Sequence, residues 1–157
     1  MLTHRLVRLI EAHSEALASE LLEKVQQSEY TRSFSRVPAE ELRRRVCEIY
    51  QHLGEWLLAR TDSDLERRYR EIGARRFRQR VPLAELIWAI ILAKQTLWEF
   101  LSWESVPDRL AEVFGELELL KLLGNFFDRA VHWASLGYED ARAQEEVAAK
   151  VTAAGRS

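Results

Sequence analysis

The stretch FFDRAVHWASLGYEDARAQEEVAAK, residues 126–150, is the most informative part of this chain. Its first half is rich in aromatic residues at helical spacing, whereas its second half is polar on nearly every side. It contains no proline and a single glycine, so both halves are predicted to form one helix. A helix that only closed a bundle would end where its apolar face ends. The extra turns therefore need a separate explanation.

Length and composition indicate one helical domain. A chain of 157 residues buries one substantial core and is too short for two ordinary ones. Its composition is 47% hydrophobic and 31% charged, with 6 glycines and 3 prolines, which favours a helical globular protein over a disordered or all-β one. The formal charge of −2 gives no general attraction to nucleic acid or to an anionic membrane.

Cysteine usage and hydropathy predict a cytoplasmic protein without a membrane span. The chain has one cysteine, Cys47, so no disulfide forms within it and a reducing compartment is favoured. The N-terminal segment mixes charged residues into an amphipathic pattern and lacks a signal-peptide cleavage site. The longest strongly apolar run, LIWAIILA at residues 86–93, is far too short to span a bilayer.

Apolar residues recur at threes and fours along the whole chain, and no alternating strand pattern competes. This periodicity predicts an all-α bundle of about five helices with a long C-terminal helix. The predicted helices cover residues 3–27, 39–60 and 65–79, a segment of about twenty residues after Pro82, and a last helix that starts near Pro107. The fourth is apolar around most of its circumference and is predicted to be central. We expect residues 1–140 to form the domain and residues 141–157 a helical connector or tail.

Residues with catalytic or metal-binding chemistry are dispersed. The four histidines lie on different predicted helices, and none has the spacing of a zinc site, so no metal or other cofactor is predicted. The sequence shows no phosphate-binding loop and no nucleophile elbow, so it does not indicate an enzyme. His132 follows Asp128 by four residues and is expected to pair with it. A haem or small-ligand sensor is an alternative, with His13 as the axial-ligand candidate or with an apolar pocket near Trp88 and Trp98.

The third predicted helix carries a dense arginine cluster, RRYREIGARRFRQR at residues 67–80. Arg75, Arg76 and Arg78 could form an anion or nucleic-acid surface, since guanidinium groups suit phosphate. The other interpretation is a solvated face, partly neutralised by the acidic residues between Glu99 and Glu118 in the same molecule or in a second subunit. No exposed aromatic residues are interleaved with these arginines, so nucleic acid is not the favoured partner.

Four segments in a fixed order resemble a known family. They are HLGEWLL (52–58), RRYREIGARRFRQRVPLAELIWAI (67–90), LWEFL (97–101) and ELELLKLLGNFFDRAVHWASLGYE (116–139). Together they resemble the N-terminal sensory domains of RsbRD-type RsbT co-antagonists, also found in STAS-domain regulators and bacterial sensor histidine kinases. The resemblance implies a non-catalytic input module joined by its last helix to an output domain, and some relatives look like globins without haem. Members usually have glycine where this chain has Arg80, which puts the geometry of that turn in question.

These features predict a dimeric sensory domain that passes a signal through its C-terminal helix to an output module or partner regulator, of the histidine-kinase (two-component) or STAS type. Small residues on the last helix allow another helix to approach closely. The residues assigned to this dimer or signalling face are Gly124, Phe127, Ala130, Ala134, Gly137 and Tyr138. Alternatively, the small residues accommodate the large Trp side chains of the same bundle, and the sequence favours neither reading.

Overall fold

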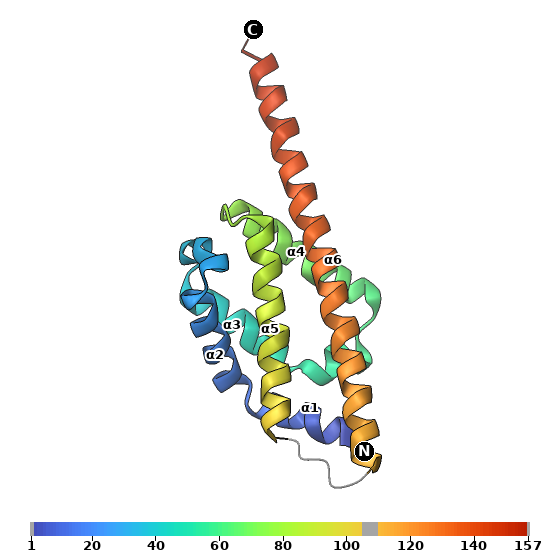
Figure 1. Cartoon of the computed structure of the whole chain (residues 1–157). Coiled ribbons are helices and arrows are strands. Elements are labelled where there is room, and N and C mark those ends of the chain that lie inside the picture. The colour runs from blue at the N-terminus through green and yellow to red at the C-terminus, as the bar shows by residue number, and fades with distance from the viewer. Residues whose placement is uncertain (1, 105–109, 157) are drawn as a thin grey trace.

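The computed structural model describes the backbone of residues 2–104 and 110–156 and the side chains of residues 4–102 and 116–156. The described part is helical almost throughout and contains no strand, which confirms the all-α prediction (Figure 1). The predicted start of the last helix near Pro107 lies outside the described residues. The elements are α1 (Leu2–Ala12), α2 (Ser14–Gln27), the 3₁₀ helix η1 (Glu29–Arg36), α3 (Ala39–Gln51), the π-helical turn η2 (Glu55–Ala59), α4 (Asp62–Arg78), α5 (Leu83–Glu104) and α6 (Leu110–Ala154).

Two predicted helices are interrupted. The helix expected over residues 3–27 breaks at His13, whose backbone leaves helical geometry (φ −104°, ψ 16°). The His13 ring Nδ1 lies within hydrogen-bond distance of the Leu9 carbonyl oxygen, at 2.8 Å, and the same oxygen also accepts a hydrogen bond from His13 N at 3.2 Å. The helix expected over residues 39–60 ends at Gln51 and continues as a π turn, in which Arg60 N donates to Glu55 O at 2.7 Å.

The start of α4 follows a local rule. Thr61 caps the helix, because its hydroxyl accepts a hydrogen bond from Asp64 N at 3.2 Å, while the Asp64 carboxylate accepts one from Thr61 N at 3.0 Å. This reciprocal capping box satisfies two backbone donors at the helix start. Thr61 is the first of three consecutive residues whose side chains could cap a helix, Thr61, Asp62 and Ser63.

The fourth predicted helix, α5, is not buried on every side. The side chains of Ile87, Ile90 and Ile91 on α5 are only half-buried, and Trp98 is 43% exposed. Among the described residues α5 contacts α2, α4, α6 and η1, whereas α6 contacts α1, α4, α5 and η2 and supplies buried residues from Leu119 to Tyr138. Apolarity around the whole of α5 therefore does not mean burial on every side.

The closest helix contact joins α4 and α6. A Cβ atom built on Gly73 of α4 would lie 1.9 Å from the Ala134 carbonyl oxygen of α6, and one on Gly137 would lie 2.1 Å from the Arg70 carbonyl oxygen of α4. The two backbones therefore touch, and only glycine fits at either position. Ring pairs flank this crossing, with centroids 5.3 Å apart for Phe77 and Tyr138. We call this contact the α4–α6 crossing.

Replacing Gly73 by alanine should push the two helices apart, because the new methyl group would meet backbone atoms that cannot rotate away. We expect a loss of roughly 3 kcal/mol in the free energy of unfolding, the upper range for overpacking, measured by urea titration. Gly124→Ala is the matched control on α6, because a Cβ there meets no atom within 4 Å. The control should gain up to about 1 kcal/mol from helix propensity. Equal stability of Gly73→Ala and the wild type would contradict the crossing.

Candidate functional site

Most residues predicted for the dimer or signalling face lie inside the fold of one chain. Ala134 and Gly137 contact α4 through Gly73 and Arg70 at the α4–α6 crossing. Gly124 is partly exposed and borders open space. The small residues at the crossing thus accommodate the backbone of a neighbouring helix in the same chain, and not Trp side chains or a second chain. The buried members of the predicted set are Phe127, Ala130, Ala134, Gly137 and Tyr138.

Ion pairs join α4 to α6 where α6 leaves the bundle. Arg70 donates from Nη1 to Asp140 Oδ2 at 2.7 Å. Arg80, two residues after the end of α4, donates from Nη1 and Nη2 to the two carboxylate oxygens of Glu145 at 3.0 and 2.9 Å. A two-pronged bond of this kind fixes orientation as well as distance. These contacts define where the supported part of α6 ends.

Arg80 adopts the left-handed conformation that normally requires glycine, with φ of 62°. The turn keeps both Schellman hydrogen bonds: Arg80 N donates to Phe77 O at 2.9 Å, and Val81 N donates to Arg76 O at 3.1 Å. Arg36 adds a third constraint by donating from Nη1 to the Arg80 carbonyl oxygen at 2.6 Å. The turn geometry expected of glycine is therefore retained with arginine, whose side chain reaches α6.

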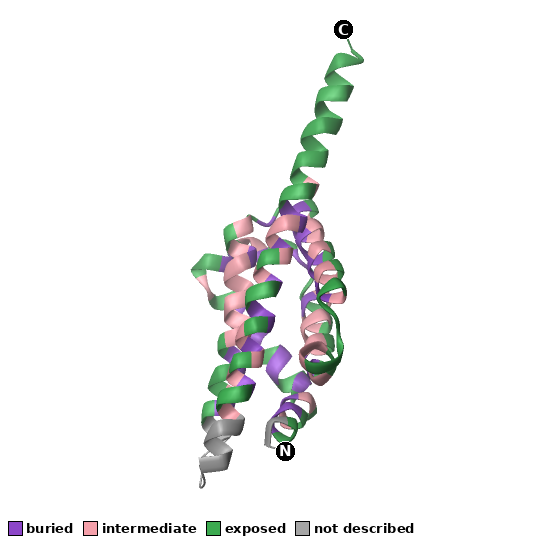
Figure 2. Ribbon diagram, turned by 90° about the vertical axis from the view of Figure 1, so that its right-hand side faces the viewer, coloured by how far each residue is buried: buried purple, intermediate pink, exposed green. Residues whose placement is uncertain are grey.

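From residue 142 α6 continues as an exposed helix, which we call the rod (residues 142–154) and which Arg80 contacts at Glu145. Every residue of the rod is exposed, and Figure 2 shows it standing clear of the bundle. Val147 and Val151 are 62% and 68% exposed. Four residues apart, they lie on the same face of the helix. The rod is thus a projecting helix with a narrow apolar stripe.

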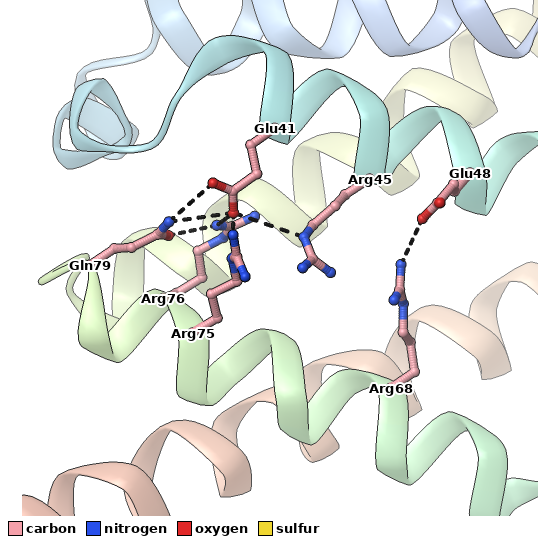
Figure 3. A network of polar contacts seen from close by, with 7 residues as sticks. All are labelled: Glu41, Arg45, Glu48, Arg68, Arg75, Arg76 and Gln79. Carbon is pink, nitrogen blue, oxygen red and sulfur yellow. Dashed lines mark hydrogen bonds and ion pairs between the residues drawn. The ribbon is translucent and has the colours of Figure 1, made fainter.

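Two of the arginines predicted as an anion surface are used inside the chain (Figure 3). The carboxylate of Glu41 on α3 accepts a hydrogen bond from Arg75 Nε, another from Arg76 Nη1 at 3.3 Å, and two from Gln79 Nε2 at 3.4 Å. Arg76 is only 2% exposed. Arg78 is exposed and has no ion pair with any described residue. These three arginines therefore do not form one free cationic surface.

The arginine cluster of α4 does not pair with the acidic residues between Glu99 and Glu118 that the structure describes. Arg68 of α4 donates to Glu48 of α3 at 3.1 Å, so α3 supplies the carboxylates that face α4. The expected acidic partner Glu99 instead pairs with Lys24 of α2 at 2.7 Å. The side chains of Asp108, Arg109 and Glu112, also in that acidic stretch, lie outside the described residues.

Hydrogen bonding fixes the charge of Glu41. The bond from Arg75 is the largest influence and lowers the pKa of Glu41 from 4.5 to about 2, although burial opposes the change. The same bond raises the pKa of Arg75. Burial lowers the pKa of Arg76, and Glu41 counteracts this, so Arg76 keeps its charge at neutral pH. Glu41 is therefore ionised throughout the physiological range and links α3 to α4.

One arginine of the same region lacks a proper partner. Arg45 of α3 has a side chain 15% exposed, and its Nε lies 3.9 Å from Glu41 Oε1, which is too far for a hydrogen bond. Its Nε is buried without a partner among the described residues. Burial, followed by repulsion from Arg75 and Arg68, lowers the pKa of Arg45. Arg45 also lines an apolar cavity of about 80 Å³ between α2, α3, α4 and α5.

The other sequence-based candidates are scattered. Trp88 packs on Tyr30, with ring centroids 5.2 Å apart, whereas Trp98 borders a separate groove between α5 and α6, so the two do not share a pocket. His13 is exposed rather than buried on an apolar stripe. The expected pair of Asp128 and His132 does not form. Among the described residues there is no cluster of potential metal ligands, and no helix there is long and apolar enough to cross a membrane.

A family model described as the N-terminal domain of the RsbT co-antagonist protein rsbRD matches residues 8–149. The chain belongs to this family. A search of curated proteins and a search of solved structures gave no match. The matched region contains the α4–α6 crossing, the Glu41 network and the Arg80–Glu145 bond. These three features therefore lie within the part of the chain that matches the RsbRD N-terminal domain. The family is one of regulatory domains.

Sequence reasoning missed Glu41 and Arg45, the two residues that organise the charged region of this RsbRD N-terminal domain. Both lie on α3, about thirty residues before the arginines that they meet. A local signal was present in part: Glu41 and Arg45 are four residues apart on a helix whose opposite face is apolar. Nothing local, however, indicates that this polar face packs against α4.

Glu41→Gln should lower the free energy of unfolding by about 3 kcal/mol at pH 7, because the pKa of Glu41 lies about 2.5 units below its ordinary value. A lowered carboxyl pKa stabilises the fold above pH 4.5, and this contribution disappears as the pH falls towards 2. The difference between wild type and variant should therefore shrink by roughly half by pH 3. Denaturant titrations at several pH values measure it. Glu40→Gln is the control, since Glu40 pairs only with neighbouring Arg43, and a difference that stays constant down to pH 3 would contradict the prediction.

Arg80→Gly should free the base of the rod without weakening the core. Glycine adopts the positive φ of this turn without strain, whereas the bond to Glu145 is lost. We expect faster amide hydrogen exchange around residues 142–149 and unchanged exchange at the α4–α6 crossing. Glu145→Gln weakens the same bond but leaves the turn intact, so it should give the same exchange pattern. Unchanged exchange of the rod in both variants would show that the bond does not hold it.

Proposed function

We propose that this RsbRD N-terminal domain is a non-catalytic sensory or regulatory input domain that passes a signal through α6 to an output module of the histidine-kinase or STAS type. The observation that supports the proposal most directly is the double role of α6. Its residues from Leu119 to Tyr138 contribute to the core, whereas residues 142–154 of the same helix are exposed to solvent. Any movement of α6 in the core is therefore also a movement of the rod.

The α4–α6 crossing and the ion pairs Arg70–Asp140 and Arg80–Glu145 are suited to passing a movement of α4 on to α6. Arg70 and Arg80 bind the rod base from α4 and the turn after it, so a shift of α4 changes the support of the rod. Backbone contact at Gly73 and Gly137 leaves no flexible side chains between the helices to absorb such a shift. A signalling domain needs two arrangements of similar energy, and exposed ion pairs are weak enough to exchange between them.

Dimerisation is proposed through the rod rather than through the buried small residues. Val147 and Val151 form an exposed apolar stripe with Ala154 on the same side. A matching stripe on a second copy would bury both in a short two-stranded coil. This arrangement places two rods side by side and leads both into the output module. It also fits a bacterial cytoplasmic regulator, for which the free thiol of Cys47 is in keeping with a reducing compartment.

The alternative of a nucleic-acid or anion surface on α4 has weaker support. Arg75 and Arg76 are bound to Glu41, and only Arg78 of the predicted trio has no such bond to a described residue. A haem sensor also has weak support, because His13 lies outside the core. The small-ligand alternative has one specific observation in its favour, the apolar cavity beside Arg45.

Changing both Val147 and Val151 to aspartate should convert a dimer into a monomer. Two carboxylates at the centre of a coil repel each other and replace the apolar contact. Sedimentation velocity over a range of protein concentrations measures the change, and circular dichroism checks that the bundle still melts cooperatively. Thr152→Asp is the matched control, because it adds a charge to another face of the rod and should leave the dimer intact. A wild-type chain that stays monomeric at every concentration would remove the dimer from the proposal.

A further inference from the structure

Arg45 is a partly buried cation with an incomplete set of hydrogen bonds. Its Nε is buried and makes no hydrogen bond to any residue that the structure describes, and Glu41, with which it forms an ion pair, lies 3.9 Å away. Buried charges in proteins are normally paired and hydrogen-bonded, and each exception calls for an explanation. An unseen partner that accepts hydrogen bonds is the simplest one.

The surroundings show that this partner should be negative. The network in Figure 3 contains four guanidinium groups, those of Arg45, Arg68, Arg75 and Arg76, and two carboxylates, those of Glu41 and Glu48. Glu71, which is exposed, attracts Arg45 from α4 but forms no ion pair with it. A second buried donor without a partner, Arg68 Nε, belongs to the same network. The α3–α4 seam is therefore short of negative charge and of hydrogen-bond acceptors.

The cavity beside Arg45 adds an apolar compartment to this cationic seam. Arg45 and Arg76 are the only charged residues among those that line it. The Tyr50 hydroxyl, another polar group of the lining, is already used, since it donates to Ala93 O at 2.9 Å. The remaining wall is mostly aliphatic and aromatic, and includes Phe34, Ile49 and Phe127. Water needs two to four polar partners and would find few away from the arginines.

Size limits the occupant. An engineered apolar cavity of about 150 Å³ binds benzene, so a cavity of about 80 Å³ has room for roughly three aliphatic carbons. A free inorganic anion would satisfy Arg45 and leave the apolar wall without contacts. A long-chain fatty acid would not fit. A short molecule with one anionic end and one apolar end matches both parts of the site.

We propose that the cavity between α2, α3, α4 and α5 binds a short aliphatic carboxylate, whose carboxylate accepts hydrogen bonds from Arg45 and whose chain lies against Ile49 and Phe127. The guanidinium fork suits a planar carboxylate. The binding site stands independently of any signalling role. Its use as the input rests on the proposed function: Tyr69 and Ile72 of α4 and Phe127 of α6 line the cavity, so an occupant touches both helices of the α4–α6 crossing.

Binding is tested on the full chain with sodium butyrate and sodium propionate, by isothermal titration calorimetry and thermal unfolding. Sodium chloride at equal ionic strength controls for general anion effects, and butyramide tests the need for charge. We expect saturable binding and a rise in Tm with butyrate, and neither with butyramide or chloride. Octanoate should bind more weakly, because its chain exceeds the cavity.

Two variants assign the effect to the site. Arg45→Met removes the cation and should weaken butyrate binding by roughly tenfold or more, without loss of folding, since Arg45 makes no hydrogen bond to a described residue and methionine fills similar space. Ala89→Leu fills part of the cavity and should also block binding. Arg43→Met is the control, because Arg43 lies on the same helix, is more exposed and pairs with Glu40.

The results separate the site from the proposed function. Equal shifts with chloride and butyrate, or full binding by Arg45→Met, would overturn the site, as would tighter binding of octanoate. Specific butyrate binding to a chain whose rods do not associate would leave the site standing and count against the dimeric signalling proposal alone.

Discussion

The backbone contact between α4 and α6 is the constraint on which the rest of the structure depends. Gly73 and Gly137 let the two helices meet without intervening side chains, and the rings of Phe77 and Tyr138 close one flank of the contact. This approach fixes the height and rotation of α6 in the bundle. It also places Asp140 and Glu145 within reach of Arg70 and Arg80. The direction in which the rod leaves the domain therefore depends on Gly73 and Gly137, which have no side chain to keep the two helices apart.

A second constraint acts between α3 and α4 and is electrostatic. Glu41 accepts hydrogen bonds from Arg75, Arg76 and Gln79, so one carboxylate orients the C-terminal half of α4. Such a network is specific in geometry and sensitive to charge balance. The balance is incomplete at Arg45, next to the cavity that lies beneath the same two helices. Close backbone packing thus holds α4 against α6, while ion pairs and hydrogen bonds, with one buried donor of Arg45 left unsatisfied, hold α4 against α3.

Much of the fold could be predicted from the sequence, because apolar periodicity shows where helices run. The all-α class, the capped start of α4 at Thr61 and the length of α6 all follow from local patterns. Local patterns do not show which neighbour covers a face. For that reason the sequence left open whether Gly137 meets a second chain or a helix of the same bundle, and it did not show that Glu41 of α3 covers Arg75 and Arg76. The break at His13 was missed because the hydrophobic pattern continues across it, with Ile10 and Leu17 both buried.

The uninterrupted course of α6 has a mechanical consequence. No proline or glycine occurs between Tyr138 and Ala154, so this segment has no built-in hinge and behaves as a stiff lever whose fulcrum is Gly137. With a rise of about 1.5 Å per residue, its tip lies roughly 25 Å from the fulcrum, and a tilt of about 10° there sweeps the tip through roughly 4 Å. A displacement too small to disturb side-chain packing in the bundle is thereby enlarged at the far end.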